Sequence, residues 1–102
     1  MDARARYDEI AGDVAARNVV AGQMFGMPTL KADGKAIGGL TDEGMVFKLP
    51  DESAREQALS FEGAHLFEPM AGRPMREWVV VPTAHADEWA SLTETALTLR
   101  AG

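Results

Sequence analysis

At 102 residues the chain has the length of one domain, and a domain of that size buries about 65% of the surface that its unfolded chain exposes. Its 16 acidic and 10 basic side chains give a net charge of −6, so its long-range field repels polyanions and makes nucleic acid an unfavourable partner. The absence of cysteine excludes disulfides, thiolate nucleophiles and thiolate metal sites.

Neither a membrane span nor a secretion signal is visible in the sequence. No apolar run approaches the roughly 20 residues that a transmembrane helix needs, and the first six residues lead into no apolar signal core. We therefore expect a cytoplasmic protein that is not bound to a membrane. No internal repeat or linker divides the chain, so residues 1–102 are predicted to form a single domain.

The first predicted element is an amphipathic helix from Asp2 to about Arg17. Its apolar stripe recurs at spacings of four, three and four residues, which is the period of one helix face. The stripe consists of Ala3, Tyr7, Ile10 and Val14. We expect residues 19–22 to link this helix to the sheet.

A three-stranded meander is predicted between Gln23 and Pro50. Asp33-Gly34 supplies the two positive-φ positions of a two-residue hairpin loop, which would place Lys31 opposite Ala36 and Leu30 opposite Ile37.

The second turn of this meander covers residues 41–44 and leads into the third strand. Alternation in that strand puts Met45, Phe47 and Leu49 on one buried face. The Gly38-Gly39 pair indicates a bulge or a close approach to the backbone, either by a helix or an aromatic side chain of this protein that packs on the sheet or by a ligand.

The second half of the chain predicts a helix, two extended segments and a last helix. A short helix over residues 51–59 would bury Ala54, Ala58 and Leu59, and residues 64–68 form a weak strand. Residues 75–81 include three successive valines, which indicate a strand inside the sheet. The last helix begins at Thr83 as N-cap, and its apolar residues are Trp89, Leu92, Ala96 and Leu99.

These elements predict an α+β fold of two layers. A mainly antiparallel sheet, made of the meander and a later strand, is covered by helices on one face. The expected order is α-β-β-β-α-(β)-β-α, where the bracketed strand is the weak one.

Five basic side chains are the leading candidates for a binding site. If they gather on the open face or at one end of the sheet, they would attract an anion or an acidic partner segment. The alternative is that they are solvated residues of an ordinary sheet surface. They are Lys31, Lys35, Lys48, Arg73 and Arg76, of which Lys31, Lys48, Arg73 and Arg76 form the predicted site.

A second candidate surface is rich in methionine. Met24, Phe25 and Met27 would form an adaptable interaction surface, or else fill the core.

No catalytic or metal-binding pattern emerges from the sequence. His65 and His85 lie 20 positions apart. Only Glu68 lies at ligand spacing from His65, and Asp87 and Glu88 near His85 are better explained by the dipole of the helix that they begin. No nucleophile elbow or phosphate-binding loop is present. We therefore predict no enzymatic activity, no catalytic residue, no metal and no cofactor.

An ordered series of short segments resembles the N-terminal domain of the TfoX/Sxy family. The resemblance runs from about Tyr7 to Leu97 and is carried by Met24-Phe25-Gly26, Leu30-Lys31, Gly34-Lys35-Ala36, Phe47-Lys48-Leu49-Pro50 and residues 72–78, Gly-Arg-Pro-Met-Arg-Glu-Trp. It implies a compact bacterial α/β domain, similar to the MmcQ/YjbR-like group, without recognised enzymatic activity. Full-length members are associated with the regulation of natural competence and carry a helical C-terminal domain, which these 102 residues do not include.

Three functions follow as expectations. The first is a regulatory or protein-interaction module with an unidentified protein partner, including a homodimer formed through a sheet edge or the methionine-rich surface. The alternative is a small-molecule or anion-binding domain that uses the sheet and Arg73/Arg76. Direct DNA binding is the third, and the net charge opposes it.

Overall fold

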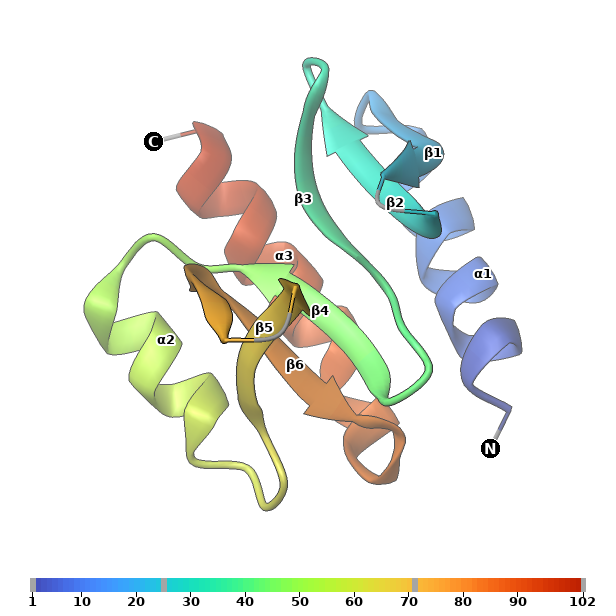
Figure 1. Ribbon diagram of the computed structural model, residues 1–102. Helices are drawn as coiled ribbons and strands as arrows, with labels where there is room; N and C mark the ends of the chain where they lie inside the picture. Colours follow the sequence, from blue (N-terminus) through green and yellow to red (C-terminus); the bar gives the residue numbers. More distant parts are fainter. Residues whose placement is uncertain (1, 25, 71, 102) are drawn as a thin grey trace.

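The computed structural model describes residues 2–24, 26–70 and 72–101, and shows a six-stranded antiparallel sheet with three α-helices packed on it (Figure 1). In chain order the elements are α1 (Ala3–Ala15), β1 (Val19–Met24), β2 (Met27–Ala32), β3 (Lys35–Leu40), β4 (Gly44–Lys48), α2 (Glu52–Leu59), β5 (His65–Met70), β6 (Arg73–Pro82), the 3₁₀ helix η1 (Thr83–Glu88) and α3 (Trp89–Ala101).

The strands are arranged in the order β1-β2-β3-β4-β6-β5, so β1 and β5 form the two edges. In Figure 1, α1 and α3 lie behind the sheet. The predicted α+β class and antiparallel sheet are confirmed. The interior position of the three valines is confirmed too, because β6 lies between β4 and β5.

The meander has four strands rather than the three predicted. Residues 19–22, expected as a link, begin β1, which pairs with β2 from Val19↔Ala32 to Met24↔Met27. The prediction failed because Gly22 and the short uncharged stretch looked like a connection. Val19 is nevertheless buried while Val20 is exposed, which is the alternation of a strand.

The β2–β3 hairpin confirms the predicted Asp33-Gly34 turn. Both residues have positive φ, 52° and 78°, and Lys31 pairs with Ala36. Leu30, however, pairs with Gly38 instead of Ile37, because the register shifts between Leu30 and Lys31.

The glycine pair of β3 lies where neighbouring strands come close. A Cβ on Gly38 would lie 2.8 Å from the Val46 carbonyl oxygen, and a Cβ on Gly39 would lie 2.6 Å from that of Pro28. The closest atoms thus belong to the backbone of adjacent strands, and not to the helix or aromatic side chain that the sequence suggested.

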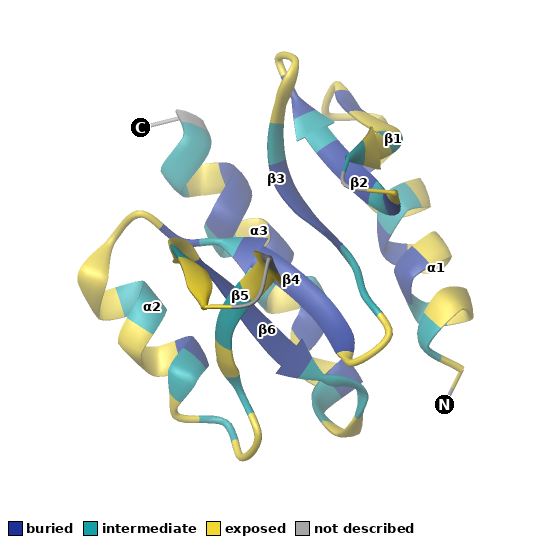
Figure 2. Ribbon diagram, viewed as in Figure 1, coloured by how far each residue is buried: buried dark blue, intermediate teal, exposed yellow. Residues whose placement is uncertain are grey.

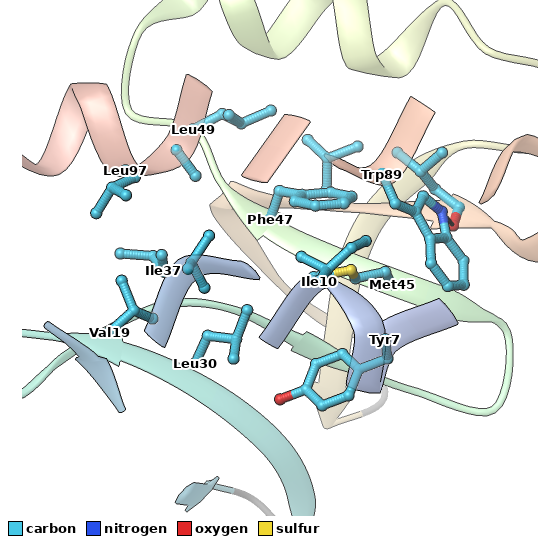
Figure 3. Packing of buried hydrophobic residues seen from close by; sticks show 14 of the residues in the cluster. Tyr7, Ile10, Val19, Leu30, Ile37, Met45, Phe47, Leu49, Trp89 and Leu97 are labelled. Atoms are coloured by element: carbon cyan, nitrogen blue, oxygen red, sulfur yellow. Dashed lines mark hydrogen bonds between the residues drawn. The ribbon is translucent and has the colours of Figure 1, made fainter. Parts of the chain in front are cut away.

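The main core lies between the helices and the sheet (Figures 2 and 3). The stripe of α1 contributes Tyr7, Ile10 and Val14, as its spacing predicted. Met45 and Phe47 of β4 and Leu49, directly after it, face them, and all three are completely buried, again as predicted. Ala58 of α2 and Trp89, Ala96 and Leu97 of α3 belong to the same core. Its other described members are Val19, Leu30, Ala32, Ile37, Val79, Val81 and Ala86.

The last helix begins later than predicted. Thr83 opens the 3₁₀ helix η1 and is not an N-cap; the capping position is Pro82, which makes no side-chain cap. Non-helical backbone at His85 (φ −109°, ψ 27°) lies within η1, and α3 follows η1 directly at Trp89. The apolar spacing thus located the buried face of α3 but not its first turn.

Tyr7 carries a polar atom into the core without a partner. The side chain is 2% exposed, and its hydroxyl makes no hydrogen bond to any described residue. Burial raises the pKa of Tyr7 from 10.0 to about 12, while the nearby Arg4 lowers it and Asp8 raises it to a lesser extent. An unpaired buried hydroxyl is a cost to the folded state.

We expect Tyr7→Phe to stabilise the protein by about 1 kcal/mol at neutral pH, since it removes this unpaired hydroxyl. The raised pKa means that the folded state holds the phenolic proton more tightly than the unfolded state does. The tighter binding of this proton therefore stabilises the folded state fully below pH 10.0. This stabilisation declines as the pH rises towards about 12. Urea unfolding of both proteins across this range measures the difference; parallel pH curves would contradict the assignment.

Candidate binding groove

The sheet face opposite the helices carries a second apolar cluster. Met27, Val46, Trp78 and Val80 form it, and each is at most 8% exposed. Val46 alternates with Met45 and Phe47, and Trp78 and Val80 alternate with Val79 and Val81, so the central strands are apolar on both faces. Partly buried side chains of Met24, Ala36, Phe67 and Met75 pack against this cluster.

A sharp bend in the β5–β6 hairpin places Phe67 and Met75 against this second cluster. Leu66 pairs with Val79, but the next residue, Phe67, pairs with Met75. Such a break in register bends a strand out of the sheet. In Figure 1, the gold end of β5 and the orange start of β6 accordingly lie in front of the sheet, on the face away from α3.

The bent hairpin and the sheet enclose a groove of about 880 Å³. Its volume falls within the range of ligand sites, roughly 300–1,000 Å³. One wall comes from the β1–β2 and β3–β4 connections, the other from the hairpin. The apolar lining consists of Met27, Pro28, Leu40, Phe67, Pro69, Pro74 and Met75, and Gly26, Thr41, Asp42 and Arg73 complete it.

Two exposed charges border the groove. Arg73 lies on the hairpin wall and Asp42 on the opposite wall. Within the described ranges, neither makes an ion pair, whereas Arg4, Arg6 and Arg17 each pair with a carboxylate. Arg73 is therefore available to an acidic group that enters the groove.

The hydroxyl of Thr41 is committed to the β3–β4 turn. Its Oγ1 donates to the Gly44 carbonyl oxygen (3.0 Å) and accepts from the N–H groups of Glu43 (3.1 Å) and Gly44 (3.2 Å). These bonds fix the loop that carries Asp42. A hydroxyl held in this way has a structural role at the rim of the groove.

The predicted site residues are distributed over several places. Met27 and Arg73 line the groove, and Met24 packs against the second cluster. Phe25 lies outside the described residues. Arg76 is exposed and does not line the groove.

The predicted lysines lie away from the groove lining. The side chain of Lys31 lies over Gly22, with Cε 3.6 Å from the position that a Cβ would take there. Lys48 lines a separate hollow of about 220 Å³ together with Lys35, Glu77 and Arg100. The four predicted cations therefore do not share one pocket.

Sequence reasoning missed most of the groove lining. Asp42 and Phe67 belong to a turn and a weak strand, and Pro74 to a stretch rich in glycine and proline. Their meeting depends on the break in the β5–β6 register, which no sequence period reveals. The prolines at positions 69 and 74 were the available signal, since they mark the bent part of the hairpin.

Both histidines have structural neighbours. His65 Nδ1 lies 3.1 Å from the Gly63 carbonyl oxygen and His65 Nε2 lies 3.4 Å from Glu43 Oε2. His85 Nε2 lies 2.9 Å from the Glu62 carbonyl oxygen. No group of three or more potential metal-ligating side chains occurs in residues 2–24, 26–70 and 72–101.

None of the helices formed by the described residues is long and apolar enough to cross a bilayer. The two longest, α1 and α3, have 13 residues each.

The structure thus defines a six-stranded α+β domain with an apolar groove on its second sheet face. Comparisons of the chain with protein-family models, with curated proteins and with solved structures found no match. The resemblance to the TfoX/Sxy N-terminal domain accordingly remains a prediction from the sequence.

Proposed function

We propose that this chain is a non-enzymatic protein-interaction module whose groove binds a short apolar segment of a partner protein that carries an acidic side chain. The observation that carries the proposal is the composition of the groove: methionine, phenylalanine and proline form the walls, and one unpaired guanidinium stands at the border of the described lining. The proposed place of action is the cytoplasm, with which a cysteine-free chain is compatible.

The apolar walls suit side chains better than a single polar metabolite. Met27 and Met75 have flexible, polarisable side chains that adapt to different apolar surfaces. Pro28 and Pro74 have no backbone N–H, so they offer no donor to a polar ligand. A partner segment with two or three apolar side chains would displace water from these walls.

Arg73 supplies the polar recognition. A guanidinium binds a carboxylate through two parallel hydrogen bonds, which fixes orientation as well as adding affinity. Asp42 on the opposite wall would repel a second acid, so one carboxylate near the hairpin wall is the expected pattern.

The polar groups of the groove support binding rather than catalysis. Thr41 is the hydroxyl of the described lining, and it is already bonded within its own turn. Neither histidine lines the groove. A proton-transfer pair of the kind that enzymes use is therefore missing from the described lining.

A regulatory role is the form of this function that the TfoX/Sxy resemblance suggests. Members of that family are associated with competence regulation, and a module that binds another protein would act in regulation without chemistry of its own. The net charge of −6 supports a protein rather than DNA as the partner.

The test is a peptide library displayed against the whole chain, followed by affinity measurements on the selected peptides. We expect an apolar consensus with one Asp or Glu. Arg73→Glu should weaken binding at least tenfold, because a hydrogen bond to a charged group contributes about 1.5–3 kcal/mol. Met75→Glu should weaken it similarly by placing a charge in the apolar wall.

Arg76→Glu is the matched control, since Arg76 is an exposed arginine of the same strand that does not line the groove. It changes the net charge equally and should alter affinity less than twofold. A library without a consensus, or equal losses at Arg73 and Arg76, would refute recognition by the groove.

A further inference from the structure

The two edges of the sheet differ in their protection. β5 carries His65, Glu68 and Pro69, and charged residues and prolines on an edge strand prevent pairing with other chains. β1 (Val19–Met24) has no charged residue and no proline along its six residues. One edge of this sheet is thus protected against pairing, and the other is open to it.

Val20 strengthens this contrast. Its side chain is 64% exposed, and no other large hydrophobic side chain among the described residues is largely exposed. It projects from the sheet face opposite α1, because its neighbour Val19 is buried in the main core. Figure 2 shows β1 as a largely exposed strand at the margin of the molecule.

The pairing of β1 with β2 determines which backbone groups remain free. Gln23 pairs with Pro28, which has no N–H and whose carbonyl oxygen faces Gly39 of β3, 2.6 Å from the position of a Cβ there, so this is a non-hydrogen-bonded pair of the β1–β2 ladder. Pairs alternate along an antiparallel ladder, and Val19 and Ala21 are therefore of the same kind. These three residues turn their N–H and C=O groups outward, towards the free edge.

We propose that two copies of this chain dimerise by pairing their β1 strands in antiparallel fashion, with Ala21 on the two-fold axis. In this register Val19 of each copy pairs with Gln23 of the other, so all three sets of outward backbone groups find partners. The same surface serves both copies, as a two-fold interface requires.

The side chains are self-complementary in this register. Val20 of one copy lies opposite Gly22 of the other, which has no side chain of its own. The alkyl part of Lys31 lies over Gly22, with Cε 3.6 Å and Nζ 3.7 Å from the position of a Cβ. Val20 would therefore pack on the glycine backbone and on methylene groups, while the Lys31 ammonium stays in water.

The dimer would have a continuous sheet of twelve strands, twice the six of one copy. Antiparallel neighbours in a sheet are related by an axis perpendicular to it, so both grooves would open on the same side. The pairing itself does not depend on what the groove binds.

The experiment is sedimentation equilibrium of the whole chain over a wide concentration range. We expect a rise from the monomer mass of 11.0 kDa to twice that value. Val20→Lys, which places two ammonium groups near the axis, should raise the dissociation constant at least tenfold. Ala21→Pro removes an outward N–H while sparing the β1–β2 bonds, and should do the same.

Thr98→Lys is the matched control, because Thr98 is exposed on α3 and the substitution adds the same charge. It should leave dimerisation unchanged, and circular dichroism checks that every variant is folded. A monomer at all concentrations, or equal dimerisation of Val20→Lys and Thr98→Lys, would overturn the proposal. Neither result would bear on peptide binding, which the Arg73 and Arg76 variants test separately.

Discussion

Gly44→Ala is expected to destabilise the protein by about 4 kcal/mol, combining backbone strain with overpacking of about 1–3 kcal/mol each. Gly44 has a φ of 154°, a conformation that residues with a side chain rarely adopt. A Cβ there would lie 2.2 Å from the Val81 carbonyl oxygen and 2.8 Å from Pro82 Cα. Both atoms belong to the backbone of β6, so neither can rotate away.

The first pair of the β4–β6 ladder would be lost with this glycine. Gly44 pairs with Pro82 and closes the turn that begins at Thr41, whose N–H donates to the Gly44 carbonyl oxygen at 2.7 Å. Displacing this backbone would disturb the turn as well as the ladder. The same turn carries Asp42, so loss of groove binding should accompany the loss of stability.

Urea denaturation of Gly44→Ala and of the control Gly12→Ala measures the effect. Gly12 lies in α1 with nothing within 4 Å of the position that a Cβ would take, so alanine should stabilise the helix by about 0.5–1 kcal/mol. Opposite signs for the two glycines are the expected result. A loss below about 1 kcal/mol for Gly44→Ala would contradict the crowding at Val81.

Local chemistry made several elements predictable from the sequence. Asp33-Gly34 determines its own turn, because both residues adopt positive φ. The alternation of Met45, Phe47 and Leu49 can be recognised within one extended segment. The spacing of the α1 stripe likewise depends on neighbours within a few turns of one helix. Each of these signals is complete within a single element or turn.

The missed features depend on contacts between distant segments. β1 is stabilised as a strand by its ladder with β2. Its own sequence gives a mixed signal, since Val19 and Val20 favour a strand and Gly22 does not. Ile37 has no partner in β2, because Lys31 pairs with Ala36 and Leu30 pairs with Gly38. This register depends on contacts between the two strands and not on the sequence of either one.

The binding site was harder to predict than the fold for the same reason. Charge singled out Lys31, Lys48, Arg73 and Arg76, but a charge does not say which surface it will share. Only Arg73 of these four lines the groove, because the β5–β6 hairpin bends between Leu66 and Met75. Apolar residues outside the predicted helices and strands, such as Pro74, were the better indicators of the groove.

Trp89→Ala is the second substitution with a large expected effect, a loss of about 3–5 kcal/mol. Trp89 is completely buried at the start of α3, and its indole Nε1 donates to the Val81 carbonyl oxygen at 3.1 Å. It therefore fastens α3 to the end of β6, at the point where η1 and the break at His85 redirect the chain. Alanine would leave a cavity between the helix and the sheet and remove this bond.

Trp89→Phe separates the two contributions, because it keeps most of the volume and removes the indole N–H. We expect it to cost about 1–3 kcal/mol, clearly less than alanine. Glu88→Ala, at the exposed neighbouring position, should change stability by no more than about 0.5 kcal/mol. Urea unfolding monitored by circular dichroism measures all three. Equal losses for phenylalanine and alanine would show that the bond to Val81, rather than the filled volume, holds α3 on the sheet.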